Sequence, residues 1–501
     1  MSRSTRTEHL PAPRTRRRLT AAALAAATAG LTTAALLALN ATTASAAPTP
    51  APATGDTRTV SQPSVPTTVC APLTSGLAMS GRTAGTADET NPPDTARIQA
   101  ALDKCAQSGS GQVAVKLSAA DAGHTAFLTG PLTVHQGEVL LLDSGVTLYG
   151  SLNPATYQVS GKPTCGTVAT DSGGCKPLIT IAGANAGVEA VRSSSGGQGR
   201  IDGRGDLDLL GTSTTWWSLA TDAKNKGEKQ NNPRMIQANS SDNFTLYDID
   251  LVNSPNFHVY YSGNGFTAWG VRIKTPATAR NTDGIDPAGA TNVTIADSYI
   301  QDGDDGIAVK GGSAASKNIT VKDSHFYGTH GISIGSETNS GVSNVLFENN
   351  TLTGTDSSGN AGGSSNGIRI KSSPANGGTV RQVTYDNTCL TKVKYPLVFD
   401  THYSSGTGSS TPYFTDILVN GVRSTGSVSG ATSTFVGLNS TYPLGLTLEN
   451  VSLDATAYTA SYANIGLYNS DITPSGTGVT TSPVSGSGSV PSCSFPAFPG
   501  L

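Results

Sequence analysis

The amino-acid sequence predicts an all-β protein built as a parallel β-solenoid, and three observations lead to this fold class. Only 13% of the 501 residues are charged and the chain holds 58 glycines and 27 prolines, a composition that excludes a coiled coil or a helical bundle. From about residue 139 the chain is a succession of short β-branched runs separated by Gly, Asn, Asp and Ser. Within this region one pattern recurs at a period in the mid-twenties, as expected when each coil contributes several strands.

The recurring pattern places a turn-forming residue before a short run of apolar residues and Thr. Its successive starts are 22, 27, 26, 26 and 38 residues apart. A β-sandwich or barrel would also contain many short strands, but it would not explain one pattern repeated at one period. The starts, which we expect to stack on one another, are Asn243, Gly265, Asn292, Asn318, Asn344 and Gln382, with Asp416 and Gly445 continuing the series.

The first element along the chain is a targeting segment. Six arginines precede an uncharged run from Leu19 to Ala46, which ends in the small residues Ala-Ser-Ala. This pattern predicts a secretory signal peptide at residues 1–46, exported by the Sec or the twin-arginine route, in preference to a retained membrane helix. Its removal changes the charged side chains from 32 basic and 35 acidic to 26 and 34, so the net charge moves from −3 to −8.

The segments that flank the predicted solenoid differ from it in composition. Residues 47–69 are rich in Pro, Thr and Ala without an apolar period, which predicts a flexible, poorly ordered linker before a single domain at 70–501. Residues 94–104 predict a helix with a possible Asp94 cap, and we expect this helix to cover the N-terminal end of the solenoid. The Gly/Ser/Thr-rich tail at 473–490 is expected to be flexible, with Cys493 as its only firm anchor.

The chain contains six cysteines, an even number that indicates disulfides in an exported protein. Fifteen pairings are formally possible, and the ten-residue spacing of Cys165 and Cys175 favours a local loop. No pair has the spacing of a zinc ribbon, so metal ligation is a minor alternative.

A second pattern, a polar residue followed by Gly and Ile, runs inside the first. It occurs at Asp283, Asp305, His330 and Asn366, at offsets of 22, 25 and 36 residues. Because equivalent positions on successive coils stack about 4.8 Å apart, these four side chains should form one row on one face. Asp304 adjoins the row, so three carboxylates are expected to meet on one surface.

This row is a candidate active site. Two adjacent acids at a glycine-bounded turn would by themselves indicate a solvated loop, and an isolated histidine a structural residue. Clustered carboxylates, however, raise the pKa of at least one member, as an acid that donates a proton near neutral pH requires. His330 can tune these acids. Arg369 and Lys371 lie two residues apart on one predicted strand, where they form either an ordinary polar face or a clamp for a carboxylate.

Together these residues resemble the signature motifs of glycoside hydrolase family 28, the polygalacturonases. The segments around 254–259, 279–287 and 331–337 are similar to bacterial secreted members in particular, and the resemblance extends from about Cys70 to near Leu467. One departure is Thr329, since the family usually has Gly directly before the motif histidine. The four motifs, in order, are Asn281-Thr282-Asp283, Gly303-Asp304-Asp305, His330-Gly331 and Arg369-Ile370-Lys371.

The resemblance implies a single-stranded right-handed parallel β-helix that hydrolyses the α-1,4 bonds between galacturonic acid units of pectin, with inversion at the anomeric carbon. Asp304 would be the general acid, while Asp283 and Asp305 would activate water and His330 would support the protonation of the acid. The implied substrate-binding residues are Asn281, Arg369, Lys371 and Tyr403, and no cofactor or metal is expected. The spacing usual for inverting enzymes, about 6.5–9.5 Å between carboxyl groups, fits poorly with residues one coil apart.

The resulting expectation is a secreted, extracellular, monomeric polygalacturonase acting on polygalacturonate or pectin, endo in mode with exo action left open. The net charge and the pI of about 6.2 argue against a nucleic-acid partner, and no membrane partner is expected after signal removal. The alternatives are a calcium-dependent pectate lyase, a non-catalytic polysaccharide-binding solenoid and a rhamnogalacturonan hydrolase, against which the clamp argues. The predicted disulfides are Cys70–Cys105, Cys165–Cys175 and Cys389–Cys493.

Overall fold

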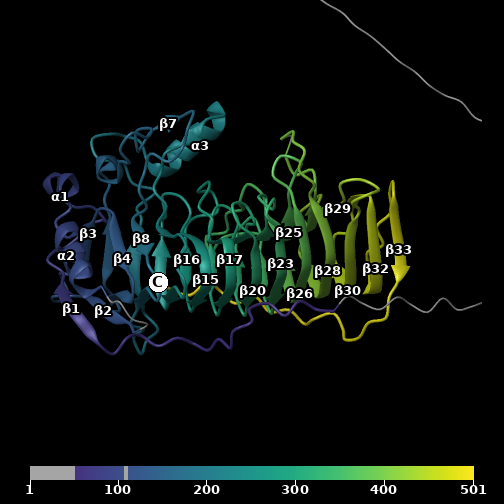
Figure 1. Ribbon diagram of the computed structural model, residues 1–501, viewed down its shortest axis with the longest axis horizontal. Coiled ribbons are helices and arrows are strands. Elements are labelled where there is room, and N and C mark those ends of the chain that lie inside the picture. Colours follow the sequence, from purple (N-terminus) through teal and green to yellow (C-terminus); the bar gives the residue numbers. More distant parts are fainter. Residues whose placement is uncertain (1–50, 107–110, 405) are drawn as a thin grey trace, which may run out of the picture. The chain divides into compact units, whose positions relative to one another are not determined.

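Thirty-one of the strands that the computed structural model describes pair into one hydrogen-bonded network, which winds as a parallel β-helix (Figure 1). The structure describes residues 51–501 except 107–110 and 405, and the predicted signal peptide at 1–46 lies outside these residues. The strands of successive coils stack into three sheets, here called A, B and C. The predicted all-β class and the parallel β-helix are therefore confirmed.

Sheet A carries the candidate site. Its strands are β4 (Leu132–His135), β8 (Ile179–Ala182), β12 (Ile236–Ala238), the first parts of β15 (Val259–Trp269) and β17 (Ile285–Ala296), β19 (Ile307–Val309), β22 (Ile332–Ile334), β25 (Asn366–Lys371), β27 (Tyr395–Asp400), β29 (Ser433–Val436) and β31 (Tyr458–Ser461).

Sheet B receives the later parts of β15 and β17 and begins at the N-terminal end of the β-helix. Its other strands are β1 (Val69–Thr74), β2 (Val113–Ser118), β5 (Glu138–Leu142), β9 (Gly187–Ala190), β13 (Thr245–Tyr247), β20 (Ser316–Lys322), β23 (Val342–Glu348), β26 (Thr379–Thr391), β28 (Tyr413–Thr425), β30 (Leu444–Leu453), β32 (Ala463–Ser470) and β33 (Val479–Pro483).

Sheet C is completed by the last residues of β26, β28 and β30. Its own strands are β3 (Ala126–Thr129), β6 (Thr147–Gly150), β10 (Gly199–Asp202), β14 (Ile249–Val252), β16 (Arg272–Lys274), β18 (Tyr299–Gln301), β21 (His325–Tyr327) and β24 (Thr351–Thr353). Outside the three sheets, β7 (Val168–Ala169) pairs with β11 (Lys229–Gln230) in antiparallel fashion.

The repeat found in the sequence corresponds to the turn into sheet B. Thr267, Thr294 and Thr320 pair in register on successive coils, as the repeat predicts. Asn292 and Asn318 before them adopt φ values of 54° and 58°, a left-handed conformation that Asn tolerates better than most residues. The side chain of Asn318 donates to that of Asn292 at 3.1 Å, so one residue type both makes the turn and links neighbouring coils.

The core of the β-helix is formed by the inward-facing side chains. In sheet A, Ile285, Ile307, Ile332 and Ile368 stack in register, and each is fully buried. Each coil can bury these apolar side chains only against its neighbours, which is why the repeat extends over many coils. The outward-facing positions between them are left for polar side chains.

A helix covers the N-terminal end, as predicted. This helix, α2 (Thr95–Cys105), buries Ile98, Ala101 and Leu102 and packs against β1, β2 and β4. The predicted capping role of Asp94 is wrong: its side chain makes no capping hydrogen bond and instead accepts from the backbone N–H of Leu128 at 2.6 Å. The carboxylate is drawn away because it also pairs with Arg97.

Two further helices and a short 3₁₀ helix, η1 (Pro154–Tyr157), precede the candidate site. The first, α1 (Thr86–Thr90), holds Glu89, whose carboxylate pairs in bidentate fashion with the fully buried Arg204 at 2.6 and 2.9 Å. The second, α3 (Trp216–Lys226), was not predicted and begins with a capping box between Thr215 and Ser218. In the described part of the chain, no helix has the length and apolar character needed to cross a membrane.

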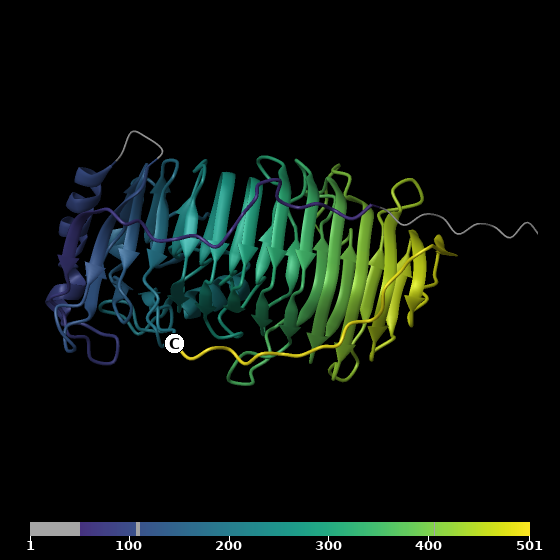
Figure 2. The same ribbon diagram turned by 90° about the horizontal axis from the view of Figure 1, so that it is seen from below.

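The prediction of a poorly ordered linker at 47–69 is wrong for the segment from Ala53 to Gln62, which runs along sheet B (Figure 2). The backbone N–H of Gly55 donates to the side chain of Asn344 at 3.1 Å, and that of Asp56 donates to Thr320 at 2.9 Å. Sequence periodicity could not reveal this segment because it is held by polar side chains on the strands of sheet B rather than by an apolar face of its own.

The C-terminal tail also differs from its prediction. Val479–Pro483 forms strand β33, and the chain then returns along the β-helix, where the Tyr327 hydroxyl donates to the carbonyl of Pro496 at 2.8 Å (Figure 2). The ring of Phe498 packs on that of Tyr327. Cys493 is therefore not the only anchor of the tail. All three predicted disulfides, Cys70–Cys105, Cys165–Cys175 and Cys389–Cys493, are present.

Candidate functional site

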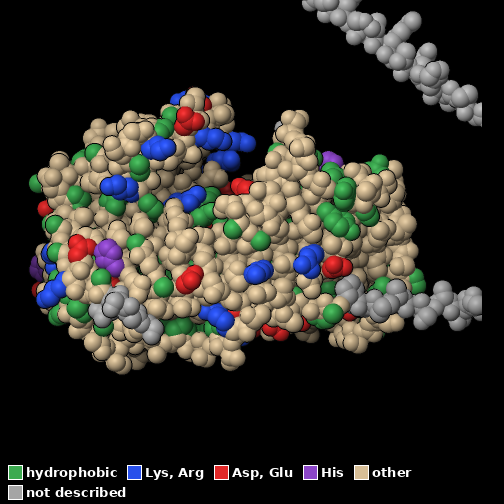
Figure 3. All heavy atoms as spheres, in the orientation of Figure 1, with side chains coloured by type: hydrophobic (Ala, Val, Ile, Leu, Met, Phe, Trp, Pro, Cys, Tyr) green, Lys and Arg blue, Asp and Glu red, His purple; other side chains and the backbone are tan. Residues whose placement is uncertain are grey.

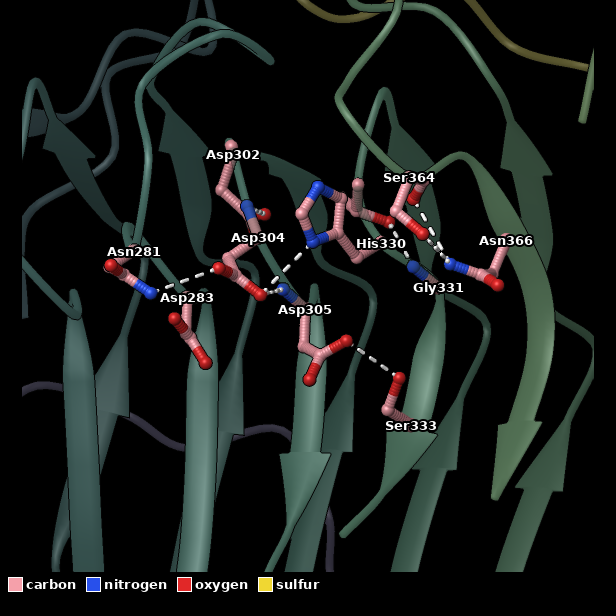
Figure 4. A network of polar contacts seen from close by, with 12 residues as sticks. Asn281, Asp283, Asp302, Asp304, Asp305, His330, Gly331, Ser333, Ser364 and Asn366 are labelled. Carbon is pink, nitrogen blue, oxygen red and sulfur yellow. Dashed lines mark hydrogen bonds and ion pairs between the residues drawn. The ribbon is translucent and has the colours of Figure 1, made fainter. Parts of the chain in front are cut away.

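The predicted row of polar side chains lies at the entry to sheet A (Figure 4). Asp283, Asp305 and His330 each stand two residues before an isoleucine, and these isoleucines pair in register on successive coils. Asn366 occupies the same position on the next coil, since Ile332 pairs with Ile368. The polar-Gly-Ile pattern thus predicted correctly which side chains share one face.

Asp304 is the centre of the hydrogen-bond network. Its carboxylate accepts from the side-chain amide of Asn281 at 3.2 Å and meets Nδ1 of His330 at 3.1 Å (Figure 4). The backbone reinforces this contact, because the N–H of His330 donates to the carbonyl of Asp304 at 2.6 Å. The N–H of Asp305 donates to the same carboxylate at 3.0 Å. The orientation of Asp304 is therefore set from both neighbouring coils.

The three carboxylates do meet on one surface. One oxygen from each of Asp283, Asp304 and Asp305 lies within 4.8 Å of the other two. Burial, together with the charges of Asp304 and Asp286, raises the pKa of Asp283 well above its usual range. Burial also opposes ionisation of Asp304, but the hydrogen bond and charge of His330 and the charges of Lys371 and Arg369 outweigh it, so the pKa of Asp304 is lowered. In the free protein these opposite directions favour protonation of Asp283 over protonation of Asp304.

Arg369 and Lys371 project to the same side, as predicted, but both contact Asp305. Nζ of Lys371 lies 2.6 Å from one Asp305 oxygen, and Nη1 of Arg369 lies 3.4 Å from the other, which also accepts from Ser333 at 2.8 Å. The two cations also lie 4.9 and 5.0 Å from the ring centre of Tyr403, which is 43% exposed. Arg369 and Lys371 are therefore paired with Asp305 and also lie beside the exposed ring of Tyr403.

A second buried ion pair, which the sequence reading missed, adjoins Asp283. Nζ of Lys310 lies 2.8 Å from Asp286 and 3.9 Å from Asp283. Burial raises the pKa of Asp286 to about 6 against the opposing charge of Lys310. Lys310 stands three residues after Ile307, as Lys371 stands three residues after Ile368, so the register that located the row could also have located this lysine.

Two other buried side chains form hydrogen bonds to the backbone of the segments that carry the acids. His258 is fully buried, and its Nδ1 donates to the carbonyls of Thr282 and Asp283 at 3.1 and 3.0 Å, while Nε2 accepts from the Thr275 hydroxyl at 2.8 Å. Burial lowers the pKa of His258 to about 4, so this ring stays neutral. Asp302, also fully buried, accepts from the N–H of Asp304 at 3.0 Å.

The loop before β25 covers His330. Asp356 anchors this loop by accepting from the N–H of Ala277 at 3.2 Å. Gly362 packs so closely that a Cβ there would lie 2.6 Å from the carbonyl oxygen of Gly328, which explains a residue without a side chain at this position. The side chain of Thr329, next to His330, is buried, and its hydroxyl accepts from the N–H of Gly331 at 3.2 Å.

The three clustered carboxylates also offer oxygen donors of the kind that hard divalent cations prefer. However, Asp305 already faces the charges of Lys371 and Arg369, and Asp304 is bonded to His330 and Asn281. Cations within hydrogen-bond distance disfavour a second positive charge at the same oxygens. The arrangement instead suits proton transfer beside a bound anion.

Comparison with known proteins gives consistent matches. A model of glycosyl hydrolases family 28 matches residues 131–472. The chain is 40% identical over 476 residues to a polygalacturonase of Ralstonia solanacearum, covering 85% of this chain and 86% of the relative. It is 42% identical over 401 residues to an endo-polygalacturonase of Pectobacterium carotovorum subsp. carotovorum, covering 79% and 90%. The solved polygalacturonase from Erwinia carotovora ssp. carotovora is similar in structure, with a TM-score of 0.70, 38% identity and coverage of 82% and 99%.

Proposed function

Because the chain belongs to glycosyl hydrolases family 28, it is a glycoside hydrolase, and we propose that the site described above hydrolyses the α-1,4 bonds between galacturonic acid units of polygalacturonate. The observation that supports this proposal most strongly is the combination of three clustered carboxylates with an adjacent pair of cations. Hydrolysis of a glycosidic bond requires one carboxyl group as an acid and another as a base. The cation pair supplies an attraction for a substrate that carries a carboxylate on every sugar.

In this proposal Arg369 and Lys371 hold the carboxylate of the galacturonate beside the scissile bond, and Tyr403 contacts its sugar ring. The half-exposed tyrosine ring lies against both cations, so a sugar that stacks on it brings its carboxylate to them. In the complex, the substrate carboxylate and Asp305 both contact Arg369 and Lys371. In the free protein, Asp305 is the carboxylate that pairs with these two cations. A rhamnogalacturonan would place a neutral sugar at one of the two positions beside the bond, which the cation pair does not favour.

Asp304 is the proposed general acid, and its low pKa in the free protein needs an explanation. Three of the groups that lower this pKa are His330, which bonds to Asp304, and the cations Lys371 and Arg369. A substrate carboxylate bound to Arg369 and Lys371 cancels part of their field, which raises the pKa of Asp304. His330 can deliver a proton through the 3.1 Å contact, and Asn281 holds the other carboxylate oxygen. The acid thus gains its proton when substrate is in place.

Asp283 and Asp305 are proposed to activate the attacking water. Once Asp304 is protonated, the repulsion that raises the pKa of Asp283 is weakened, so Asp283 can ionise and act as a base. General acid–base assistance of this kind contributes about 10²–10⁴-fold to the rate. Substrate binding therefore favours the two protonation states that hydrolysis requires, an acid at Asp304 and a base at Asp283.

Inversion at the anomeric carbon is proposed from the family, although the nearest carboxylate oxygens lie within 4.8 Å, below the usual separation of about 6.5–9.5 Å between carboxyl groups. NMR of the first product, recorded before mutarotation, decides the point. Cleavage of an α bond with inversion gives the β anomer, and an α anomer as first product would contradict inversion.

The reaction type is tested by the ends of the products released from polygalacturonate. Hydrolysis yields saturated reducing ends, whereas a lyase yields an unsaturated C4–C5 bond that absorbs in the ultraviolet. The proposal expects reducing ends without this absorbance, and activity that a calcium chelator does not abolish. Unsaturated products or loss of activity on chelation would favour a pectate lyase.

An endo mode of action is proposed from the endo-polygalacturonase of Pectobacterium carotovorum, to which the chain is 42% identical. Early products of mixed length would support it, and release of monomer alone would contradict it. Secretion to the extracellular space by a signal peptide at 1–46, and a monomeric state, are proposed from the sequence. Protein N-terminal sequencing of the exported form and its mass in solution test these two points.

A further inference from the structure

We propose that the cavity between α3 and the start of sheet A is a second carboxylate-binding subsite, in which Arg234 and Arg280 hold a galacturonate of the same chain distant from the scissile bond. This inference rests on the proposed action on polygalacturonate. The cavity has a volume of about 430 Å³, and its lining includes Arg234, Phe257, Arg280 and Asn281. Asn281 also donates to Asp304, so one residue of the lining contacts the catalytic carboxylates directly.

The geometry of Arg234 resembles that of the cation pair on the other side of the acids. Its guanidinium lies 4.3 Å from the ring centre of Tyr260 and 5.0 Å from that of Phe257, and both rings are half-buried. A cation held over aromatic rings is also what Arg369 and Lys371 form with Tyr403. Such a pairing provides a flat surface for a sugar and a charge for its carboxylate.

Arg234 and Phe257 occupy the same row as the catalytic residues. Each stands two residues before a sheet A position, Ile236 and Val259, that pairs in register with the next coil and leads to Ile285. Ile236 and Ile368 are five coils apart, which corresponds to about 24 Å along the axis. A substrate that reaches both arginine sites must therefore be an oligosaccharide lying along the β-helix, across the acids.

The two arginines of this cavity differ from the cation pair because no carboxylate lies within ion-pair distance of them among the described residues, although the charge of Arg234 does act on Asp286. Arg369 and Lys371 are paired with Asp305, whereas in the described part of the chain neither Arg234 nor Arg280 forms an ion pair, and Arg234 donates only to the side chain of Gln237 at 3.1 Å. Lys224 and Lys229 add exposed cations to the lining, against one acid, Glu228. Figure 3 shows Lys and Arg side chains gathered beside the hollow next to α3. In a chain with net negative charge, this is a local attraction for a polyanion.

The test measures kcat/KM on oligogalacturonates of increasing length for the wild type and three variants, Arg234→Gln, Arg280→Gln and Arg381→Gln. Arg381 is the matched control, because it is an exposed arginine on sheet B whose guanidinium also donates to a glutamine, Gln382, at 2.9 Å. Thermal unfolding of each variant verifies that the fold is retained.

For the wild type, kcat/KM should rise with length once the chain reaches the cavity. Arg234→Gln and Arg280→Gln should each reduce kcat/KM on the long oligomers by about tenfold, the loss expected for one charge-assisted contact, and leave the shortest cleaved oligomer unchanged. The cleavage sites on a long oligomer should also shift. Arg381→Gln should match the wild type at all lengths.

Two results would overturn the subsite. The first is that the Arg234 and Arg280 variants match Arg381→Gln at every length. The second is an equal loss at every length, which would assign the two arginines to the catalytic step or to the fold. Failure of the wild type to release reducing ends from any oligomer would instead refute the proposed function, so the two failures are distinguishable.

Discussion

The contact between Lys371 and Asp305 makes a two-part prediction for the substitution Lys371→Met, which keeps a long apolar side chain and removes the charge. The lysine and the aspartate are 6% and 2% exposed, and their charged atoms lie 2.6 Å apart. Removing one partner of a buried ion pair costs about 3–5 kcal/mol. Because Ser333 and Arg369 still contact Asp305, we expect a loss at the lower end, about 3 kcal/mol in the free energy of unfolding.

The same substitution removes one cation from the proposed clamp. A hydrogen bond to a charged group contributes about 1.5–3 kcal/mol, which corresponds to a loss of about 10–100-fold in kcat/KM on polygalacturonate. A methyl ester has no charge for the lysine to attract, so the loss on methyl-esterified pectin should be smaller. The kcat/KM on polygalacturonate, divided by that on methyl-esterified pectin, should therefore be lower for Lys371→Met than for the wild type.

Reducing-end release from both substrates, together with denaturant unfolding, measures the two parts. Lys317→Met is the control, because Lys317 is exposed on β20 and should change neither quantity. An equal loss of kcat/KM on both substrates would refute the clamp, and an unchanged free energy of unfolding would refute the contribution of the ion pair.

Two further predictions concern the pKa of Asp283 and the C-terminal tail. Because the pKa of Asp283 is raised, the folded state keeps a proton that the unfolded chain releases near pH 4. The contribution of Asp283 to stability therefore falls as the pH rises from about 4 towards the pKa of Asp283 in the folded state. Asp283→Asn removes this dependence, so its thermal midpoint should exceed that of the wild type above about pH 5, by about 1 °C for each kcal/mol recovered in a domain of this size. Turnover should be lost, and equal midpoints across the pH range would contradict the raised pKa. Replacing Cys389 and Cys493 by Ser opens a link between residues 104 apart and should cost about 2–4 kcal/mol of stability while kcat/KM on polygalacturonate is retained, since Cys389 pairs within sheet C rather than sheet A. An unchanged thermal midpoint would show that the tail is held by its other contacts alone.

The row of site residues could be predicted because two short sequence patterns report the register of the coils. The polar-Gly-Ile pattern fixed the alignment of Asp283, Asp305 and His330, and the structure repeats that alignment through their isoleucines. The same register contains Lys310, three residues after Ile307, but this lysine lies outside the four motifs and nothing in the sequence shows that it approaches Asp286. Its ion pair with Asp286 shows that outward positions of sheet A carry charge beyond the four family motifs.

Other parts of the fold were less accessible from the sequence. Helix α3 does carry a signal, since Trp216, Leu219, Ala220 and Ala223 form one buried face and Gly227 ends the helix in a left-handed conformation. The segment from Ala53 to Gln62 has no such pattern, because its partners are polar side chains on strands of sheet B that are distant in the sequence. The charge state of Asp304 was also beyond the sequence, since it depends on how near His330, Arg369 and Lys371 approach in space.

The central claim is that the clustered carboxylates perform acid–base hydrolysis of polygalacturonate, and Asp304→Asn tests it most directly. Asparagine keeps the shape of the side chain but cannot donate the proton. Turnover of polygalacturonate should fall by about 10²–10⁴-fold, while calorimetry should show that the variant still binds oligogalacturonate with an affinity close to that of the wild type. Turnover by Asp304→Asn equal to that of the wild type would contradict the claim.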